Sequence, residues 1–190
     1  MNDVTSLPQA MIDDFVAAAH GDFDKVKRLI AERPELVHAE ASWRERALEA
    51  ASQTGRADIV EFLLAAGARL DVCTSVMLGD MRQVEAFLSM DPNLINARGA
   101  NDLPLMYFAA IRGYREIAEY LLQLGAEINA GRGGNTALHG AVRFGQTEMV
   151  SWLLANEADA NSLDYNGKIP LQLAEENDQT EIAEFIRKSL

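Results

Sequence analysis

Hydrophobic residues recur along this chain in one pattern, about one and two helical turns after a series of landmark positions. The landmarks are Gly21, Gly55, Gly79, Gly113, Gly145 and Asp178. The apolar sets that follow them are Val26/Leu29/Ile30, Ile59/Leu63/Leu64, Val84/Phe87/Leu88, Ile117/Leu121/Leu122, Met149/Leu153/Leu154 and Ile182/Phe185/Ile186. This spacing places the apolar side chains on one face of a helix. Because no single helix pair can bury such a face, the pattern predicts stacked helix pairs.

A shift of 58 positions superposes much of the first part of the chain on the second, including residues 34–37 (PELV) on residues 92–95 (PNLI). The landmarks themselves are 34, 24, 34, 32 and 33 residues apart. Glycine suits a left-handed residue in the tight turn after a short first helix, and Asp178 is a substitute that tolerates this conformation. Each landmark is therefore predicted to join a short helix to a longer one.

Two segments carry a family resemblance. Residues 135–141 (NTALHGA), followed by Gly145, resemble the turn and first helix of the ankyrin repeat, whose motif reads T-P-L-H with Ala and Gly downstream, and residues 169–174 (IPLQLA) form a second copy. Residues 63–68 (LLAAGA) and 121–129 (LLQLGAEIN) are similar to the closing part of the repeat. The resemblance implies an all-α ankyrin-repeat solenoid of about six helix-turn-helix units with short β-hairpin loops.

The landmarks divide the chain into an N-terminal extension, residues 1–10, and one repeat domain, residues 11–190. The repeats are expected at about 11–43, 44–70, 71–101, 102–133, 134–166 and 167–190. The 24-residue step leaves no room for a hairpin between the second and third repeats, so this junction is predicted to be truncated. In the last repeat Arg187 replaces the leucine of earlier copies, which is typical of a polar terminal cap.

The charge balance narrows the choice of partners. Asp and Glu number 29 against 17 Lys and Arg, a net charge of -12, so nucleic acid and membrane surfaces are disfavoured. The start of the chain does not read as a signal peptide, and no apolar run approaches the ~18 residues of a spanning helix. The single cysteine, Cys73, lies in a predicted packed helix, and these observations favour a cytoplasmic location.

Catalytic and metal-binding patterns are weak. The resemblance implies that His139 braces its own turn, while His38 is interpreted as a loop residue and His20 as exposed. One cysteine and three dispersed histidines do not form a zinc motif, so neither metal nor cofactor is expected. Residues 131–134 (GRGG) lack the preceding strand and following Lys-Ser/Thr of a phosphate loop and are interpreted as a hairpin tip. We therefore expect no enzymatic activity.

Partner binding is the remaining hypothesis, and the resemblance implies a concave surface made by hairpin tips and by the two residues before each landmark. The predicted contacts on the short helices are Met77, Leu78, Ile111, Arg112, Arg143 and Phe144. Those at the tips are Trp43, Arg98, Arg132 and Tyr165, with Arg44 and Asn101 as further candidates. Aromatic, Met and Arg side chains are enriched at interface centres. The alternatives are that Leu78 and Phe144 pack beneath their neighbours and that Trp43 covers the first repeat.

Three arginines in consecutive repeats, Arg112, Arg132 and Arg143, suggest a basic strip for a peptide that carries carboxylates and apolar anchors. The predicted function is non-catalytic binding of a protein or peptide by a monomer. One alternative is an acidic inhibitor that blocks a nucleic-acid-binding partner. Another, an enzyme or small-molecule receptor, would need a deep pocket that an open solenoid rarely supplies. The linker at residues 91–96 (DPNLIN) looks like those of stand-alone prokaryotic family members.

Overall fold

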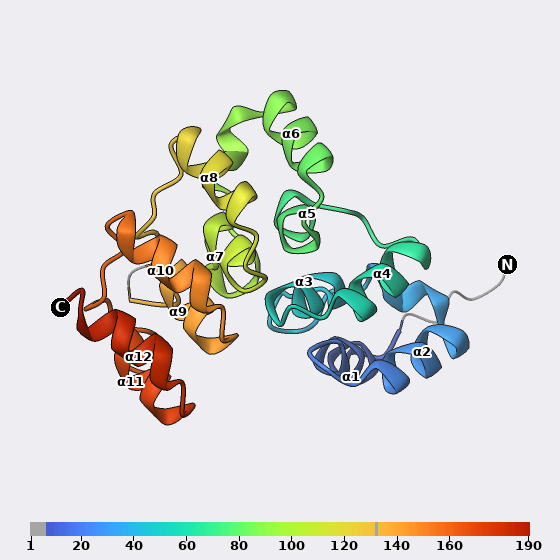
Figure 1. The fold of residues 1–190 in the computed structure, drawn as a ribbon. Coiled ribbons are helices and arrows are strands. Elements are labelled where there is room, and N and C mark those ends of the chain that lie inside the picture. The colour runs from blue at the N-terminus through green and yellow to red at the C-terminus, as the bar shows by residue number, and fades with distance from the viewer. Residues whose placement is uncertain (1–6, 132) are drawn as a thin grey trace, which may run out of the picture.

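A computed structural model describes residues 7–131 and 133–190, which form paired α-helices stacked in an arc (Figure 1). The first helices of the pairs are α1 (Gln9–Ala19), α3 (Ala47–Gln53), α5 (Val72–Leu78), α7 (Leu105–Ala110), α9 (Ala137–Arg143) and α11 (Pro170–Glu176). The second helices are α2 (Phe23–Glu32), α4 (Ala57–Ala65), α6 (Met81–Met90), α8 (Arg115–Gln123), α10 (Thr147–Ala155) and α12 (Thr180–Arg187). The first helices line the inside of the arc, and the second helices form its outside.

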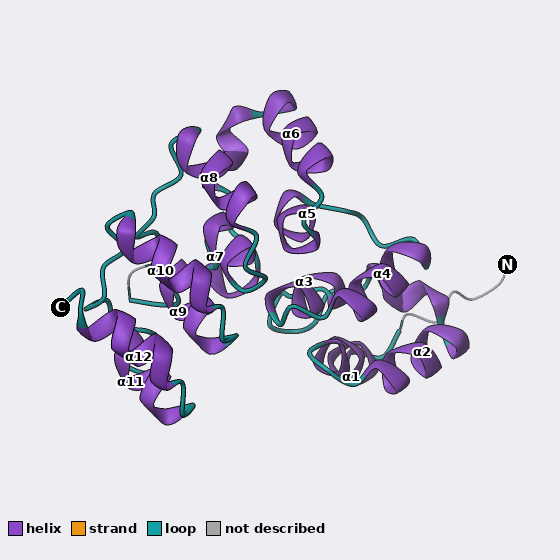
Figure 2. Cartoon of the chain, in the orientation of Figure 1, coloured by secondary structure: helices purple, strands orange, loops and turns teal. Residues whose placement is uncertain are grey.

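The described residues contain no β-strand, as the all-α prediction requires (Figure 2). Three short 3₁₀ helices, η1 (Pro34–His38), η2 (Pro92–Asn96) and η3 (Ala100–Asp102), lie in the connections. Two of the hairpins carry only a single β-bridge, Glu40 with Arg46 and Arg98 with Pro104. Helix α1 begins at Gln9, two residues before the expected start of the repeat domain at position 11.

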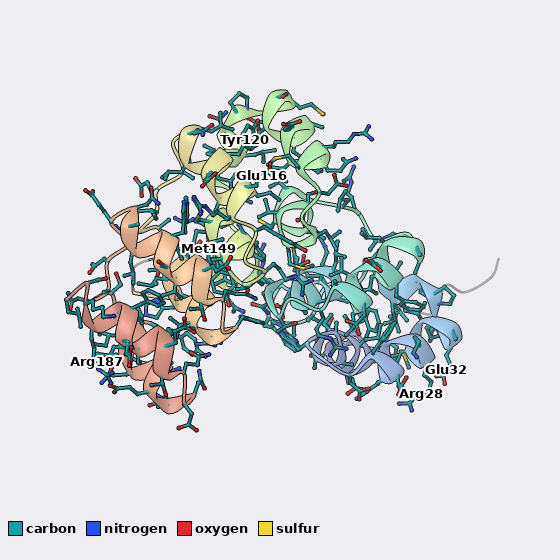
Figure 3. All side chains as sticks on the ribbon, in the orientation of Figure 1. Arg28, Glu32, Glu116, Tyr120, Met149 and Arg187 are labelled. Atoms are coloured by element: carbon teal, nitrogen blue, oxygen red, sulfur yellow. The ribbon has the colours of Figure 1, made fainter. Side chains whose placement is uncertain are left out.

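The apolar stripes of the second helices are buried against the first helices, as their spacing predicts. Val26, Ile59, Val84, Leu121 and Leu153 are fully buried. Charged side chains occupy the opposite faces of these helices: Arg28 and Glu32 on α2 and Arg187 on α12 point outward at the two ends of the arc (Figure 3). The outer surface is therefore polar while one continuous apolar core runs along the stack.

The landmark turns have the predicted conformation at five of six positions. Gly55, Gly79, Gly113 and Gly145 have φ between 66° and 76°, and Asp178 has φ 56°. Gly21 is the exception, and the prediction is wrong there. Its N–H donates to Ala18 O at 3.0 Å and continues the last turn of α1 without a left-handed residue.

The connection between the second and third repeats is short, as predicted. Helix α4 ends at Ala65 and α5 begins at Val72, so residues 66–71 are the whole linker. Between α8 and α9 the linker is residues 124–136, which is long enough for a hairpin. Asp71 begins α5 directly by accepting a hydrogen bond from Thr74 N at 2.7 Å.

None of the helices in the described part of the chain is both long enough and apolar enough to cross a bilayer.

Candidate functional site

The inside of the arc contains a hollow of about 600 Å³. Its walls come from the inner helices or their ends in the first, second, fourth and fifth repeats and from the three connections that precede α7, α9 and α11. The lining residues are His20, Gln53, Thr54, Asn101, Leu103, Tyr107, Gly134, Asn135, Arg143, Phe144 and Tyr165. A volume of this size is in the range of ligand-binding clefts. The concave face is therefore more enclosed than the open surface expected from the sequence.

The hollow exists because the turn after α3 approaches the ends of α7 and α9. A Cβ atom on Gly55 would lie 3.4 Å from the Phe144 ring and 3.7 Å from both Arg112 Cδ and Ile111 Cδ1. These residues belong to the fourth and fifth repeats, whereas Gly55 belongs to the second. We attribute this close approach to the short connection between the second and third repeats, because a linker without a hairpin lets the arc turn sharply at α5.

Three of the lining residues, His20, Gln53 and Asn101, belong to a network of polar side chains that joins three repeats. Glu45 is 5% exposed and accepts hydrogen bonds from Trp43 Nε1 at 2.7 Å and from Gln53 Nε2 at 2.5 Å. Gln53 Nε2 also lies 2.9 Å from His20 Nε2, and Asn101 Nδ2 donates to Gln53 Oε1 at 2.7 Å. Networks of this kind rigidify a site when every member is satisfied. We name these five residues the Glu45 network.

His20 belongs to this network and is not simply exposed, so that expectation is corrected. Its Nε2 lies 3.5 Å from Glu45 Oε2, and its side chain is 37% exposed. The hydrogen bond with Glu45 raises the pKa of His20 above its ordinary value, against the opposing effect of burial. At moderately acidic pH the hollow therefore gains a second cationic group.

The opposite wall holds Arg143 between an acid and an aromatic ring. Arg143 Nη2 lies 3.7 Å from Asp164 Oδ2, and its guanidinium lies 5.8 Å from the centre of the Tyr165 ring. Asp164 is buried and its Oδ1 accepts from the N–H groups of Asn166 and Lys168 at 2.8 and 2.9 Å. A hydrogen bond from Arg143 lowers the pKa of Tyr165. These contacts fix Arg143 at the edge of the hollow.

The structure corrects two of the predicted contact residues. Met77 and Ile111 are 0% and 1% exposed, so neither can contact a partner. Ile111 fills the space above Gly140 of α9, where a Cβ atom would lie 3.0 Å from Ile111 Cγ2. Met77 and Ile111 are each the first of the two residues that precede a landmark glycine, and both pack between neighbouring inner helices. Leu78 is half-buried against the core, as the alternative for it supposed.

Other predicted residues are brought together. Arg143, Phe144 and Tyr165 line the hollow, and Phe144 is half-buried there. Trp43 is 49% exposed and does not line the hollow, but its Nε1 donates to Glu45, which is bonded in turn to the lining residue Gln53. The Trp43 indole lies beside the first repeats and remains partly exposed to solvent.

The basic strip is not assembled as predicted. Arg112 is exposed but does not line the hollow: its Nη1 donates to Gly55 O at 3.4 Å, and its guanidinium lies 5.9 Å from the Tyr114 ring centre. Arg98 lines the cavity at the short junction and not the hollow, and Arg132 falls outside the described residues. Of the three strip arginines, Arg143 alone among the described ones faces the hollow.

Sequence reasoning missed three lining residues, Leu103, Tyr107 and Asn135. A signal existed for Tyr107, because it stands where the repeat motif places its histidine. Burial raises the pKa of Tyr107, so its hydroxyl stays protonated at neutral pH. No comparable signal marked Leu103 or Asn135, whose roles depend on how distant connections meet.

A second cavity, of about 290 Å³, lies at the short junction. Its walls include Phe87, Leu94, Phe108 and the buried thiol of Cys73. Burial raises the pKa of this thiol strongly, which makes it an unreactive structural cysteine. No three His, Cys, Asp or Glu side chains are grouped as metal ligands anywhere in residues 7–131 and 133–190.

The stacked helix pairs, left-handed turns and concave inner surface define a helical repeat solenoid. Comparison with known proteins gives the family. A model of ankyrin repeats in three copies matches residues 72–164 and 131–189. The chain belongs to the ankyrin-repeat family.

Similar curated proteins include NF-kappa-B inhibitor alpha of Gallus gallus, which is 33% identical over 150 residues, covering 70% of this chain and 47% of the relative. The probable E3 ubiquitin-protein ligase XBOS32 of Oryza sativa subsp. japonica is 37% identical over 100 residues, 50% of this chain and 20% of the relative. Protein fem-1 homolog A-like of Mus musculus is 37% identical over 82 residues, 43% of this chain and 12% of the relative.

The chain spans less than half the length of these relatives. All three come from eukaryotes, so the comparisons give no support to a prokaryotic origin.

Proposed function

We propose that this chain is a non-catalytic module that binds a protein or peptide in its concave hollow. The observation that carries the proposal is the composition of the hollow: the aromatic rings of Tyr107, Phe144 and Tyr165 line it together with Arg143, whose guanidinium lies 5.8 Å from the centre of the Tyr165 ring. Aromatic and Arg side chains in a partly desolvated depression are the usual anchors of protein interfaces. The ankyrin-repeat family, whose members serve in general as protein-interaction modules, supports the same function.

The rigidity of the site also favours recognition over chemistry. The Glu45 network and the Asp164–Arg143 pair hold the walls in place before any partner arrives, which reduces the entropic cost of binding. We propose further that the protein acts as a monomer in the cytoplasm, since Cys73 is buried as a free thiol.

Affinity capture from a lysate of the source cells tests this proposal. The intact chain is compared with a Phe144→Glu/Tyr165→Glu variant, which changes the hollow. The matched control is Met90→Glu/Leu124→Glu, because these two apolar residues are 85% and 47% exposed and do not line the hollow. Circular dichroism and thermal unfolding establish that all three proteins are folded.

A partner retained by the intact chain and the control, but lost by the Phe144/Tyr165 variant, is the expected result. Retention of the same partner by all three proteins would contradict the proposal and move recognition to another surface.

A second candidate is an inhibitor that covers a basic, nucleic-acid-binding surface of its partner. The net charge of -12 and the similarity to a protein named as an inhibitor favour it. Ionic strength separates the two candidates. Affinity of an acidic mimic should fall steeply between 50 and 300 mM salt, whereas binding through aromatic and apolar contacts in the hollow should change little.

A further inference from the structure

We propose that the hollow receives one acidic residue of a peptide segment, with Arg143 binding its side-chain carboxylate and Asn135 its backbone N–H. This rests on the proposed function and names the group that the site recognises. The occupant is thus a Glu or Asp within a chain, and neither a free anion nor a chain terminus.

The lining residues indicate that the group bound in the hollow carries a negative charge. None of the lining residues is Asp or Glu, although the chain has 29 of them. Arg143 is the one permanently charged side chain in the set, and the raised pKa of His20 favours its protonated form. In a protein of net charge -12, a hollow walled by cationic and neutral groups is a local site for an anion.

Neither of the nearby carboxylates, those of Glu45 and Asp164, lines the hollow, and three of their four oxygens are bonded to other groups of the protein. Glu45 accepts from Trp43 and Gln53, and Asp164 Oδ1 accepts from two backbone N–H groups. Asp164 Oδ2 faces Arg143 but at 3.7 Å, which is longer than a hydrogen bond. Asp164 therefore orients the guanidinium without occupying its donors.

The geometry of Arg143 suits a carboxylate. A guanidinium presents a planar fork of donors that matches the two oxygens of a carboxylate, and such charge-assisted pairs are shorter and stronger than neutral hydrogen bonds. Contact with the Tyr165 ring and with Asp164 limits the rotamers of Arg143 in advance. Less entropy is lost when the pair forms.

Asn135 distinguishes a peptide residue from a free anion. Within the described residues its side-chain Oδ1 is buried and has no hydrogen-bond partner. A buried acceptor left unpaired is costly, so this atom is suited to receive a donor from a ligand. Acetate offers only acceptors at this position, and phosphate offers only an O–H of the anion itself, whereas a backbone amide next to an acidic side chain brings a separate N–H donor. Phe144 and Leu103 supply apolar contact for the methylene groups.

The test uses N-acetyl-glutamate N-methylamide as the probe and N-acetyl-glutamine N-methylamide as its neutral match. Both are titrated into the ¹⁵N-labelled chain, and binding is followed by the amide shifts of the lining residues and by the Arg143 side-chain Nε resonance. The expected result is saturable binding of the glutamate probe, at least about tenfold tighter than that of the glutamine probe.

Three variants test which side chains of the protein bind the two probes. Arg143→Gln should weaken the glutamate probe by about tenfold or more and leave the glutamine probe nearly unchanged. Asn135→Ala should weaken both probes several-fold. Arg112→Gln is the matched control, because Arg112 is an exposed arginine of the neighbouring repeat outside the hollow, and it should change neither affinity.

Two further ligands test whether the hollow binds a chain-terminal carboxylate or a free anion in place of an acidic side chain. N-acetyl-alanine carries a terminal carboxylate with a neutral side chain, and inorganic phosphate carries charge without an N–H. Equal or tighter binding of either, or equal affinity of the two amide probes, would overturn the inference. So would unchanged affinity in Arg143→Gln. If these results appear while capture still depends on Phe144 and Tyr165, the proposed function stands and the assignment of the carboxylate alone fails.

Discussion

The fifth and third repeats solve the same problem, starting a first helix, in different ways. In the fifth, Thr136 Oγ1 lies 2.8 Å from His139 Nδ1, and His139 Nε2 lies 3.2 Å from Lys168 O of the next repeat. In the third, Asp71 alone caps α5, and Thr74 Oγ1 lies 3.0 Å from Ser52 Oγ of the preceding repeat. The fifth repeat is joined to the next repeat through its turn, whereas the third repeat is joined to the preceding one through its inner helix.

The hairpins show the same contrast. Asn129 joins the tips that follow the fourth and fifth repeats: its Nδ2 donates to Glu157 O at 3.0 Å, and its Oδ1 accepts from Asp159 N at 2.7 Å. At the short junction the place of a hairpin is taken by the cavity of about 290 Å³. The difference teaches that loss of a hairpin has two effects: it leaves packing incomplete on one side, and it bends the inner surface into a hollow on the other.

Core truncation should separate the two regions most strongly. Leu121 is fully buried in a regular repeat, so Leu121→Ala should lower the free energy of unfolding by about 2–5 kcal/mol. Leu70, half-buried at the wall of the junction cavity, should lose less than about 1.5 kcal/mol on truncation to Ala. Urea denaturation of both variants measures the difference, and equal losses would show that the junction is packed as tightly as the rest.

Two landmark glycines should differ by a smaller amount. A Cβ on Gly79, which follows α5, would lie 2.8 Å from the Tyr114 ring, whereas one on Gly145 would meet nothing closer than Gln179 Nε2 at 3.6 Å. Both have positive φ, so Gly145→Ala should cost about 1 kcal/mol for conformation alone. Gly79→Ala should cost about 2–3 kcal/mol because the ring must also move. Thermal unfolding compares them, and a smaller loss at Gly79 would contradict the close packing.

The partly exposed His20 and the buried His139 should respond to pH in opposite directions, with the smallest effects. The folded pKa of His20 is raised by Glu45, so its contribution to stability is complete below its unfolded pKa and is lost as pH rises through the folded value. Burial lowers the folded pKa of His139, so its contribution is complete above the unfolded value and is lost as pH falls toward the folded value.

His20→Gln should therefore cost more at pH 5.5 than at pH 8, by up to about 0.5 kcal/mol because the group is partly exposed, and His139→Gln should cost more at pH 8. Unfolding free energies of the variants and the intact chain at both pH values provide the measurement. The same pH trend in both variants would show that one of the two environments is misassigned.

The periodic features of the fold could be predicted from sequence because they depend on local patterns. Apolar spacing located the helices, and the distance from Gly55 to Gly79 located the truncated junction. The burial of Met77 and Ile111 could not be predicted, since it depends on how neighbouring inner helices interlock. The hollow was missed for a related reason: it requires Gly55 to meet Phe144, and local spacing carries no information on contacts between repeats that are not adjacent.

The approach of Gly55 to Phe144 is the central claim, and one nuclear Overhauser experiment tests it most directly. In the intact chain, with labelled glycine, phenylalanine and tyrosine, the account predicts a cross-peak between the Phe144 ring and the Gly55 α-protons. The Tyr107 ring and Gly140 provide an internal control, because a Cβ on Gly140 would lie 2.8 Å from that ring. A control cross-peak without the Gly55–Phe144 peak would contradict the account and leave an open arc in place of the hollow.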